Sequence, residues 1–272
     1  MRIVPLGVRG STPAPGAAFV RYGGNTSCVA VHRSGADAPG LLLDAGTGLR
    51  ALRRLLPAGA AFAGTILLSH LHWDHVQGLP FCPEVDRDDA RVDLRLPDPG
   101  DRADAATTLA RGMSPPHFPI GPDGLRGRWS FEVLAPGRHA VEGFSVLAAE
   151  VAHKGGRTLG FRIEADGRSM AYLPDHAPVE GLPAPVLALV GGVDLLLHDG
   201  QYLASERSTA LAYGHSVVDD VVELAVRTGV RRLVLTHHAP DRTDDQLDRL
   251  AATMAGAPLP VTLAAEGTEI PV

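Results

Sequence analysis

Positions 65–75 read Thr65-Ile-Leu-Leu-Ser-His70-Leu-His72-Trp-Asp74-His75. The run 65–68 is largely apolar and too short for a helix, which predicts a buried strand. Four side chains of metal-binding type follow it within six positions. Because a tight turn points alternate side chains in different directions, His70 and His72 are expected to bind one metal ion while Asp74 and His75 face a second. The alternative, a histidine-rich surface turn, gives no reason for so many ligand-type residues at the end of a strand.

Other short apolar runs end in the same way, in a residue that can bind metal or move protons: Asp44, Asp175, the pair His198-Asp199, and His237. In layered α/β folds, sites form beyond the carboxyl ends of strands, so residues far apart in the sequence can converge there. One such ending would be a trivial strand terminus. Their repetition predicts a single site built from the ends of several strands.

Short apolar runs and helical patterns alternate along the chain. Several of the runs are apolar on both faces, which is typical of strands buried between layers. Apolar residues at helical spacing mark 48–56, and capping signals mark helices over 216–228 and from Thr243 onward. This alternation predicts an α/β fold in which helices cover sheet layers. Strands are expected at 3–6, 28–31, 41–43, 65–68, 144–151, 159–163, 170–173, 193–197 and 233–236.

The chain has 272 residues, of which 45% are hydrophobic, and it is interpreted as one large domain over 1–272. The segment from about 81 to 127 differs from the rest because it is rich in Pro, Gly and Asp. Since apolar runs resume on both sides of it, we interpret it as an inserted, lid-like segment over the site and not as a linker. A plain surface crossing is the alternative.

Charge and cysteine content limit the partners and the compartment. The formal net charge is −6 and the basic residues form no stripe, so a long nucleic acid is not the expected partner. Cys28 and Cys82 are far apart and are interpreted as free thiols. No apolar run reaches the roughly 18 residues of a membrane span, and the N-terminus lacks the apolar core of a signal peptide. We therefore expect a cytoplasmic protein without a membrane partner, and a homodimer is compatible with the sequence.

Further motifs lie at 6–13 (Leu-Gly-Val-Arg-Gly-Ser-Thr-Pro) and at 22–27 (Tyr-Gly-Gly-Asn-Thr-Ser). Together with the His-x-His-x-Asp-His stretch and the order of the later His and Asp residues, they resemble the metallo-β-lactamase superfamily. The resembling branch is that of ribonuclease Z and the PhnP-type cyclic phosphodiesterases. The resemblance covers nearly the whole chain and implies an αββα sandwich with the metals at one edge. It also implies that His153 completes the first metal site, Asp175 bridges the two metals and His237 completes the second.

The same resemblance suggests the metals and two catalytic residues. Flavin-linked di-iron members carry Glu where His72 stands, so two Zn²⁺ ions are expected, and Mn²⁺ suits the same ligands. The ribonuclease-Z-like branch has an acidic residue and a histidine that match Asp199 and His215. His215 would act as general acid and Asp199 would orient it, while Asp74 would accept a hydrogen bond from the attacking hydroxide. The alternative for His215 is a water-exposed residue at the start of a helix.

Two further residues are expected to contact a small anionic substrate. Lys154 is the only lysine of the chain and follows His153, where related sequences commonly have proline. Its ammonium could meet a phosphate, and a solvent-facing lysine is the alternative. His117, in the Pro-rich segment, is a second substrate-binding hypothesis. Asp44 is interpreted as a residue that fixes a turn or orients a ligand histidine, and His32 as a solvated loop residue.

Together these features predict a dinuclear hydrolase in which a metal-bound hydroxide attacks a small or cyclic phosphodiester. Cleavage of precursor tRNA is less expected, because no long Gly/Pro-rich clamp arm of the ribonuclease Z kind is evident and the net charge is negative. A thioester, lactone or amide hydrolase of the same fold would use the same ligands. A non-catalytic metal-binding regulatory protein is the third alternative, but it would have no use for a general acid at His215.

Overall fold

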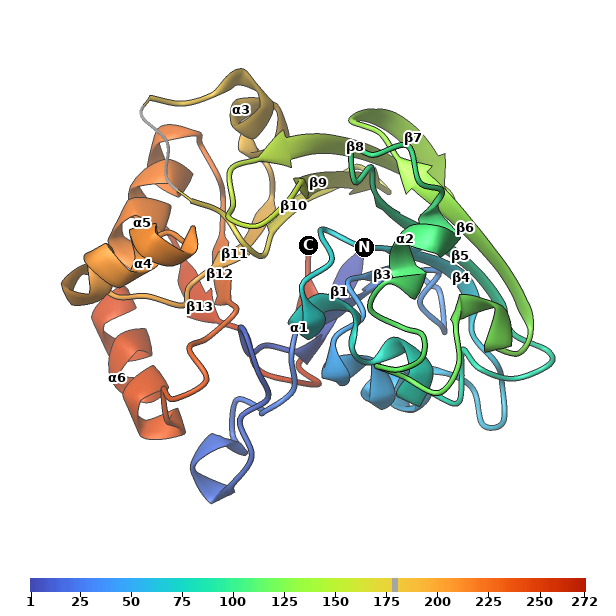
Figure 1. The fold of residues 1–272 in the computed structure, drawn as a ribbon. Helices are drawn as coiled ribbons and strands as arrows, with labels where there is room; N and C mark the ends of the chain where they lie inside the picture. The colour runs from blue at the N-terminus through green and yellow to red at the C-terminus, as the bar shows by residue number, and fades with distance from the viewer. Residues whose placement is uncertain (178–180) are drawn as a thin grey trace.

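The computed structural model describes residues 1–177 and 181–272, and within them two seven-stranded sheets face each other (Figure 1). The first sheet has the order β14-β1-β2-β3-β4-β5-β6, with β1 (Arg2–Gly7), β2 (Cys28–His32), β3 (Leu41–Leu43), β4 (Ala63–Leu67), β5 (Arg91–Pro97), β6 (Arg128–Leu134) and β14 (Ile270–Pro271). The second has the order β13-β12-β11-β10-β9-β8-β7, with β7 (Gly137–Val141), β8 (Phe144–Val151), β9 (Thr158–Ala165), β10 (Arg168–Leu173), β11 (Leu195–Asp199), β12 (Leu233–Thr236) and β13 (Val261–Leu263).

Each sheet contains a block of parallel strands. Strands β3 to β6 run parallel in the first sheet, and β10 to β13 run parallel in the second. The carboxyl ends of parallel neighbours lie at the same edge of a sheet. The chain ends also meet, since β1 pairs with β14 and the Val272 N–H donates to the Met1 carbonyl at 3.1 Å (Figure 1).

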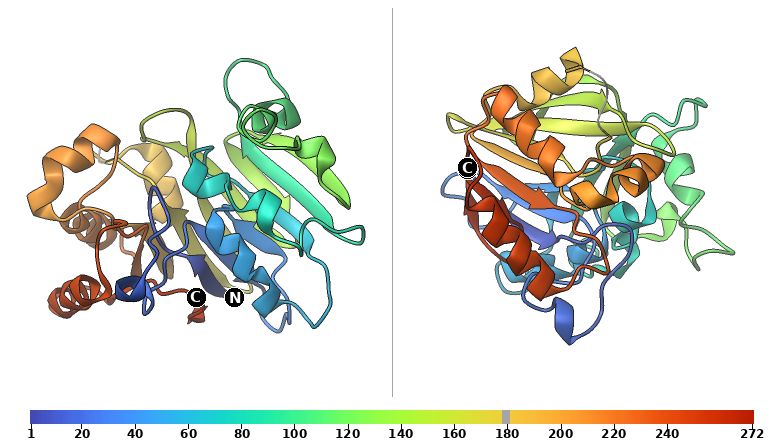
Figure 2. Two further views of the ribbon diagram at one scale, coloured as in Figure 1. Left: turned by 60° about the horizontal axis from the view of Figure 1, so that its bottom comes forward. Right: turned by 90° about the vertical axis from the view of Figure 1, so that its left-hand side faces the viewer.

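Three apolar cores explain why so many strands are apolar on both faces. Leu41 and Leu43 of β3 belong to the core between the two sheets, whereas Leu42 belongs to the core on the outer face of the first sheet. That outer face is covered by η2 (Thr47–Leu55) and α2 (Ala105–Ala110). The outer face of the second sheet is covered by α3 (Ala184–Val190), α5 (Val218–Arg227) and α6 (Asp244–Met254) (Figure 2). The predicted αββα sandwich is therefore confirmed.

The predicted helices are found with small changes. The pattern at 48–56 forms a 3₁₀ helix, η2, in place of an α-helix, and α5 begins at Val218, two residues after Ser216. Helix α6 begins after Thr243, whose N–H donates to the Gln246 side chain at 2.8 Å, as the capping signal predicted. The remaining short elements are η1 (Ala17–Phe19), α1 (Trp73–Val76), η3 (Leu79–Phe81), η4 (Pro122–Gly124), η5 (Ala204–Glu206) and α4 (Arg207–Tyr213).

The segment 81–127, which we expected to be an insertion, contains a strand of the first sheet. β5 lies between β4 and β6 and is parallel to both. Its apolar residues Val92, Leu94 and Leu96 alternate with Arg91, Asp93 and Arg95, so that one face is buried in the outer core. That part of the segment therefore belongs to the sheet. The end of η3 and a loop precede β5, and loops, α2 and η4 follow it.

Other expectations concern single residues and the membrane. Cys28 and Cys82 are free and buried, as expected. The expectation for His32 was wrong, because this residue ends β2 and is 1% exposed. Burial lowers the pKa of its imidazole, and nearby Arg2 lowers it further. In the described part of the chain, no helix is both long and apolar enough to cross a membrane.

Candidate metal centre

The first group of metal-binding side chains consists of His70, His72, His153 and Asp175. His70 and His72 follow β4, His153 follows β8, and Asp175 follows β10. Asp175 Oδ2 lies 3.3 Å from the Nε2 atoms of His70 and of His153. His72 Nδ1 lies 2.9 Å from His70 Nε2 and 3.4 Å from His153 Nε2. Four potential donor atoms thus surround one point.

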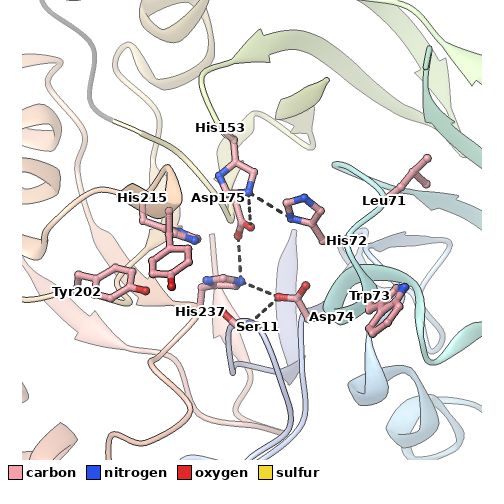
Figure 3. A pocket seen from close by; sticks show the side chains of 11 residues that line it. Ser11, Leu71, His72, Trp73, Asp74, His153, Asp175, Tyr202, His215 and His237 are labelled. Atoms are coloured by element: carbon pink, nitrogen blue, oxygen red, sulfur yellow. Dashed lines mark hydrogen bonds and ion pairs between the residues drawn. The ribbon is translucent and has the colours of Figure 1, made fainter. Parts of the chain in front are cut away.

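The second group consists of Asp74, His75, His237 and the other oxygen of Asp175. Figure 3 shows Asp74, His237 and Asp175 of this group. Asp74 and His75 lie on α1, and His237 follows β12. His237 Nε2 lies 3.1 Å from Asp74 Oδ2 and 3.0 Å from Asp175 Oδ1. His75 Nε2 lies 3.3 Å and 3.5 Å from the same two oxygens. Asp175 therefore presents one oxygen to each group, as a bridging carboxylate would.

These distances fit metal ligands. Four ligands about 2.0–2.1 Å from a tetrahedral ion are about 3.3 Å apart, which agrees with the separations in both groups. His75 Nε2 and Asp175 Oδ1 are buried and have no hydrogen-bond partner among the described residues. Such orphaned polar atoms are costly in a folded protein unless something else, such as an ion, binds them. The residues present therefore fit a dinuclear metal centre.

The two groups differ in the protons they hold before a metal binds. Burial lowers the pKa of His70, His72 and His153, which favours the neutral imidazole that binds metal. Burial would also lower the pKa of His237, but Asp175 and Asp74 outweigh it and raise that pKa to about 10. Asp74, Asp44 and Asp175 likewise outweigh burial at His75 and raise its pKa well above the ordinary value. The two histidines of the second group must therefore each lose a proton to bind a metal near neutral pH, whereas those of the first group need not.

Asp44 holds the ligand His75 from behind. This buried carboxylate follows β3 and accepts a hydrogen bond from His75 Nδ1 at 2.8 Å. Its Oδ2 also accepts from the Tyr172 hydroxyl at 2.8 Å and from the Ser69 hydroxyl at 2.9 Å, and its Oδ1 accepts from the Ser69 N–H at 2.6 Å. With Nδ1 donating to Asp44, Nε2 of His75 keeps its lone pair for a metal. The expected orienting role of Asp44 matches this geometry.

Other ligands are held by backbone groups. His153 Nδ1 donates to the Gly214 carbonyl at 2.7 Å, and the Ser11 N–H donates to Asp74 Oδ2 at 2.7 Å. Gly10 packs against His237 so closely that a Cβ atom there would lie 2.4 Å from His237 Nδ1. A side chain at Gly10 would therefore displace this ligand.

The two residues predicted to act without binding metal lie beside the ligands. His215 follows α4, and its Nδ1 donates to Asp199 Oδ2 at the end of β11, at 2.7 Å. The His215 ring stacks on that of His237, with centroids 5.4 Å apart, and lies 5.0 Å from that of His153. His215 is 5% exposed, so the alternative of a water-exposed helix start does not describe it.

The two proposed substrate contacts lie elsewhere. The Lys154 ammonium donates to the Ala212 carbonyl near the end of α4 at 2.8 Å and lies 5.8 Å from the centre of the Tyr213 ring. His117 is exposed, and neither it nor Lys154 lines the cavity over the ligands. The geometry suggests that Lys154 supports α4, where a cation also interacts favourably with the carboxyl end of the helix.

A cavity of about 590 Å³ opens over both ligand groups and reaches His215 (Figure 3). Besides the predicted residues, it is lined by residues to which sequence reasoning gave no role: Ser11, Leu71, Trp73, Tyr202 and Tyr213. Ser11 belongs to a motif that carried the resemblance, and Trp73 lies between two predicted ligands in the sequence. Their positions in the sequence could therefore have indicated that Ser11 and Trp73 line the site. The two tyrosines offer no local signal.

An αββα fold with two clusters of His and Asp ligands at one edge defines a metal-binding hydrolase. Residues 40–238 match the family model described as the beta-lactamase superfamily domain, and the chain belongs to the metallo-β-lactamase superfamily.

A ribonuclease Z of Mycobacterium bovis is 27% identical and is matched over 81% of this chain and 84% of its own length. Two solved structures share the fold. Zn²⁺-bound PqqB from Methylobacterium extorquens has a TM-score of 0.73 at 21% identity and covers 100% of each chain. A diphosphatase of the PhnP family has a TM-score of 0.70 at 18% identity and covers 100% of this chain and 97% of its own. The predicted relation to ribonuclease Z and PhnP-type enzymes is confirmed.

Proposed function

We propose that the protein is a phosphodiesterase that acts on a small or cyclic phosphodiester. The observation that carries the proposal is the hydrogen-bonded pair of His215 and Asp199, in which His215 lines the cavity over the ligand groups and Asp199 is buried behind it. A leaving alkoxide needs a proton as the ester bond breaks, whereas a non-catalytic metal-binding protein would not need a general acid and its orienting partner. Homology to ribonuclease Z adds support for phosphodiester substrates.

The ligand set suits two zinc ions, with manganese as the alternative, because imidazole nitrogens and carboxylate oxygens bind both. Bound there, two such ions would activate a water molecule as the nucleophile and stabilise negative charge on the phosphoryl oxygens. His70, His72 and His153 with one oxygen of Asp175 would hold the first ion, and Asp74, His75 and His237 with the other oxygen would hold the second.

The chain's own residues account for orientation and proton transfer. Because Nδ1 of His215 donates to Asp199, Nε2 is the atom that faces the substrate, and the doubly protonated ring gives its Nε2 proton to the leaving oxygen and becomes neutral. Burial acts to raise the pKa of Asp199, but His215 and His237 outweigh it and keep this pKa below its ordinary value. Asp199 is therefore an acceptor that fixes the ring. Asp74, held by the Ser11 N–H, has a carboxylate in the cavity that can accept a hydrogen bond from the attacking water.

The side chains that line the cavity also favour a small substrate rather than a polynucleotide. None of the side chains that line it in the described structure is Lys or Arg. A polynucleotide needs cationic contacts to several phosphates, whereas one phosphodiester needs only the metal centre. The negative net charge of −6 agrees with this preference.

The proposal is tested by assaying zinc-loaded and manganese-loaded protein on chromogenic phosphodiester, thioester, lactone and β-lactam substrates. We expect the highest kcat/KM on the phosphodiester. A higher kcat/KM on a thioester or lactone would refute the proposed substrate class and favour a thioester, lactone or amide hydrolase of the same fold.

The general acid is tested with a series of leaving groups. His215→Ala should slow a diester with an alkyl or nucleoside leaving group by about 10²–10⁴-fold, but slow a nitrophenyl diester much less, since nitrophenolate leaves without a proton. Asp199→Asn should act in the same direction by less, because it disturbs only the orientation of the ring. A uniform loss across the series, with metal content unchanged, would refute the general-acid role of His215.

A further inference from the structure

Three aromatic side chains line the cavity over the metal centre: Trp73, Tyr202 and Tyr213. Trp73 is 77% exposed and Tyr213 is 59% exposed. Leaving an indole this exposed forgoes much of the favourable burial that aromatic side chains normally gain. Because Trp73 both lines the cavity and keeps most of its surface exposed, its ring is available for a ligand to contact.

Trp73 is fixed relative to the metal ligands. It lies between His72 and Asp74 in the chain, and its carbonyl accepts the Gln77 N–H at 2.8 Å in α1. Asp74 in turn is held by Ser11. The backbone of Trp73 thus belongs to a turn whose neighbouring residues are the predicted metal ligands, which places the indole beside the metal centre.

The aromatic residues lie on two sides of the centre. Tyr202 is on the side of His215, with ring centroids 5.6 Å apart, and Tyr213 precedes His215 by two residues. In Figure 3, Trp73 lies on the other side of the metal ligands from Tyr202. Since His215 must be next to the leaving oxygen, the two tyrosines flank the leaving group. Trp73 then flanks the ester substituent that stays on phosphorus.

We propose that Trp73 binds a planar aromatic or heteroaromatic ring on the retained side of the phosphodiester, and so selects diesters that carry such a ring. The inference rests on the proposed phosphodiesterase function. Stacking is the available source of binding energy for the retained substituent, because no cationic side chain lines the cavity in the described structure and the metal centre would bind only the phosphate. A ring that stacks on an exposed aromatic side chain gains affinity without any sequence-specific hydrogen bond.

The test compares methyl 4-nitrophenyl phosphate with phenyl 4-nitrophenyl phosphate, which share a leaving group and differ only in the retained substituent. Trp73→Ala should lower the phenyl-to-methyl ratio of kcat/KM by about 5-fold or more, the usual effect of losing one stacked ring. Trp73→Phe should keep most of the ratio. Tyr213→Ala is the matched control. It should leave the ratio unchanged, because Tyr213 flanks the leaving group and the leaving group is the same in both substrates. An unchanged ratio in Trp73→Ala, with metal content intact, would overturn the proposal.

A binding measurement separates this proposal from the catalytic one. The chain has two tryptophans, and Trp129→Phe leaves Trp73 as the only indole reporter. In the metal-loaded variant, phenyl phosphate should change the fluorescence emission of Trp73, and it should do so at a lower concentration than methyl phosphate. Equal effects of the two monoesters would refute the ring site even if diesters are hydrolysed. A selective response to phenyl phosphate in a protein that hydrolyses neither diester would support the ring site and refute the phosphodiesterase function.

Discussion

Replacing Asp44 by Asn should weaken the second metal site while leaving the first largely intact. Asp44 lies behind His75 and does not line the cavity, so the change removes no ligand. The carboxylate accepts hydrogen bonds from three side chains and one backbone N–H. An amide of the same shape has one acceptor oxygen and brings an NH₂ group that cannot accept. One or more of these donors would then face another donor.

The expected loss of metal affinity at the second site follows from the hydrogen bond that fixes the ring of His75. Without an acceptor at Nδ1, the imidazole can hold its proton on Nε2, the atom that faces Asp74 and Asp175, and that tautomer cannot bind a metal there. Loss of such an outer partner typically reduces metal affinity by about 10–100-fold, or about 1.4–2.7 kcal/mol. The first site should change less, because its ligands do not contact Asp44 directly.

The assay is a zinc titration of the metal-free protein against a chromogenic chelator, which resolves two affinities. Tyr172→Phe is the matched control, since it removes one donor to the same Asp44 oxygen and leaves the bond to His75 in place. We expect it to retain both affinities within a few fold. Equal weakening of both sites by Asp44→Asn, or a loss as large in Tyr172→Phe, would refute the orienting role, and circular dichroism would establish that each variant is folded.

Four further outcomes are expected. Asp175→Ala should lose metal and activity together, and two tightly held metals by elemental analysis would remove Asp175 from the bridging position. Metal affinity of the second site should rise with pH up to about 10, because His237 and His75, whose pKa values are both raised, must release protons to bind, and calorimetry in buffers of different ionisation enthalpy would reveal those protons. Lys154→Ala should reduce kcat/KM about equally for charged and neutral substrates if it supports α4, whereas a selective rise in KM for diesters would show a phosphate contact. Gly10→Ala should displace His237 and reduce metal content toward one ion per chain, and two tightly held ions would contradict this.

The sequence by itself predicted the residues that the structure brings together in the two groups, His153 through the family resemblance alone, and most of the strands that carry them. The stretch at 65–75 is local, so the spacing of His70, His72, Asp74 and His75 along one turn is set by backbone geometry alone. Apolar runs buried on both faces stand out without knowledge of their partners, and the observed bounds of β8 agree with the predicted 144–151. Asp175 and the other strand-end residues were found because parallel strands bring their carboxyl ends to one edge.

Tertiary structure decided what depends on contacts between distant segments. The alternating pattern of β5 was hidden among charged residues, and Arg91 is neutralised by Glu142, which lies 51 residues away in the chain. Lys154 was expected at a phosphate, but its partner is a carbonyl of α4, 58 residues on. The exposure of Trp73 could not be predicted from the sequence either. Exposure and pairing are set by which surfaces meet after the sheets pack, whereas a local ligand motif or a buried apolar run carries its signal within a few residues.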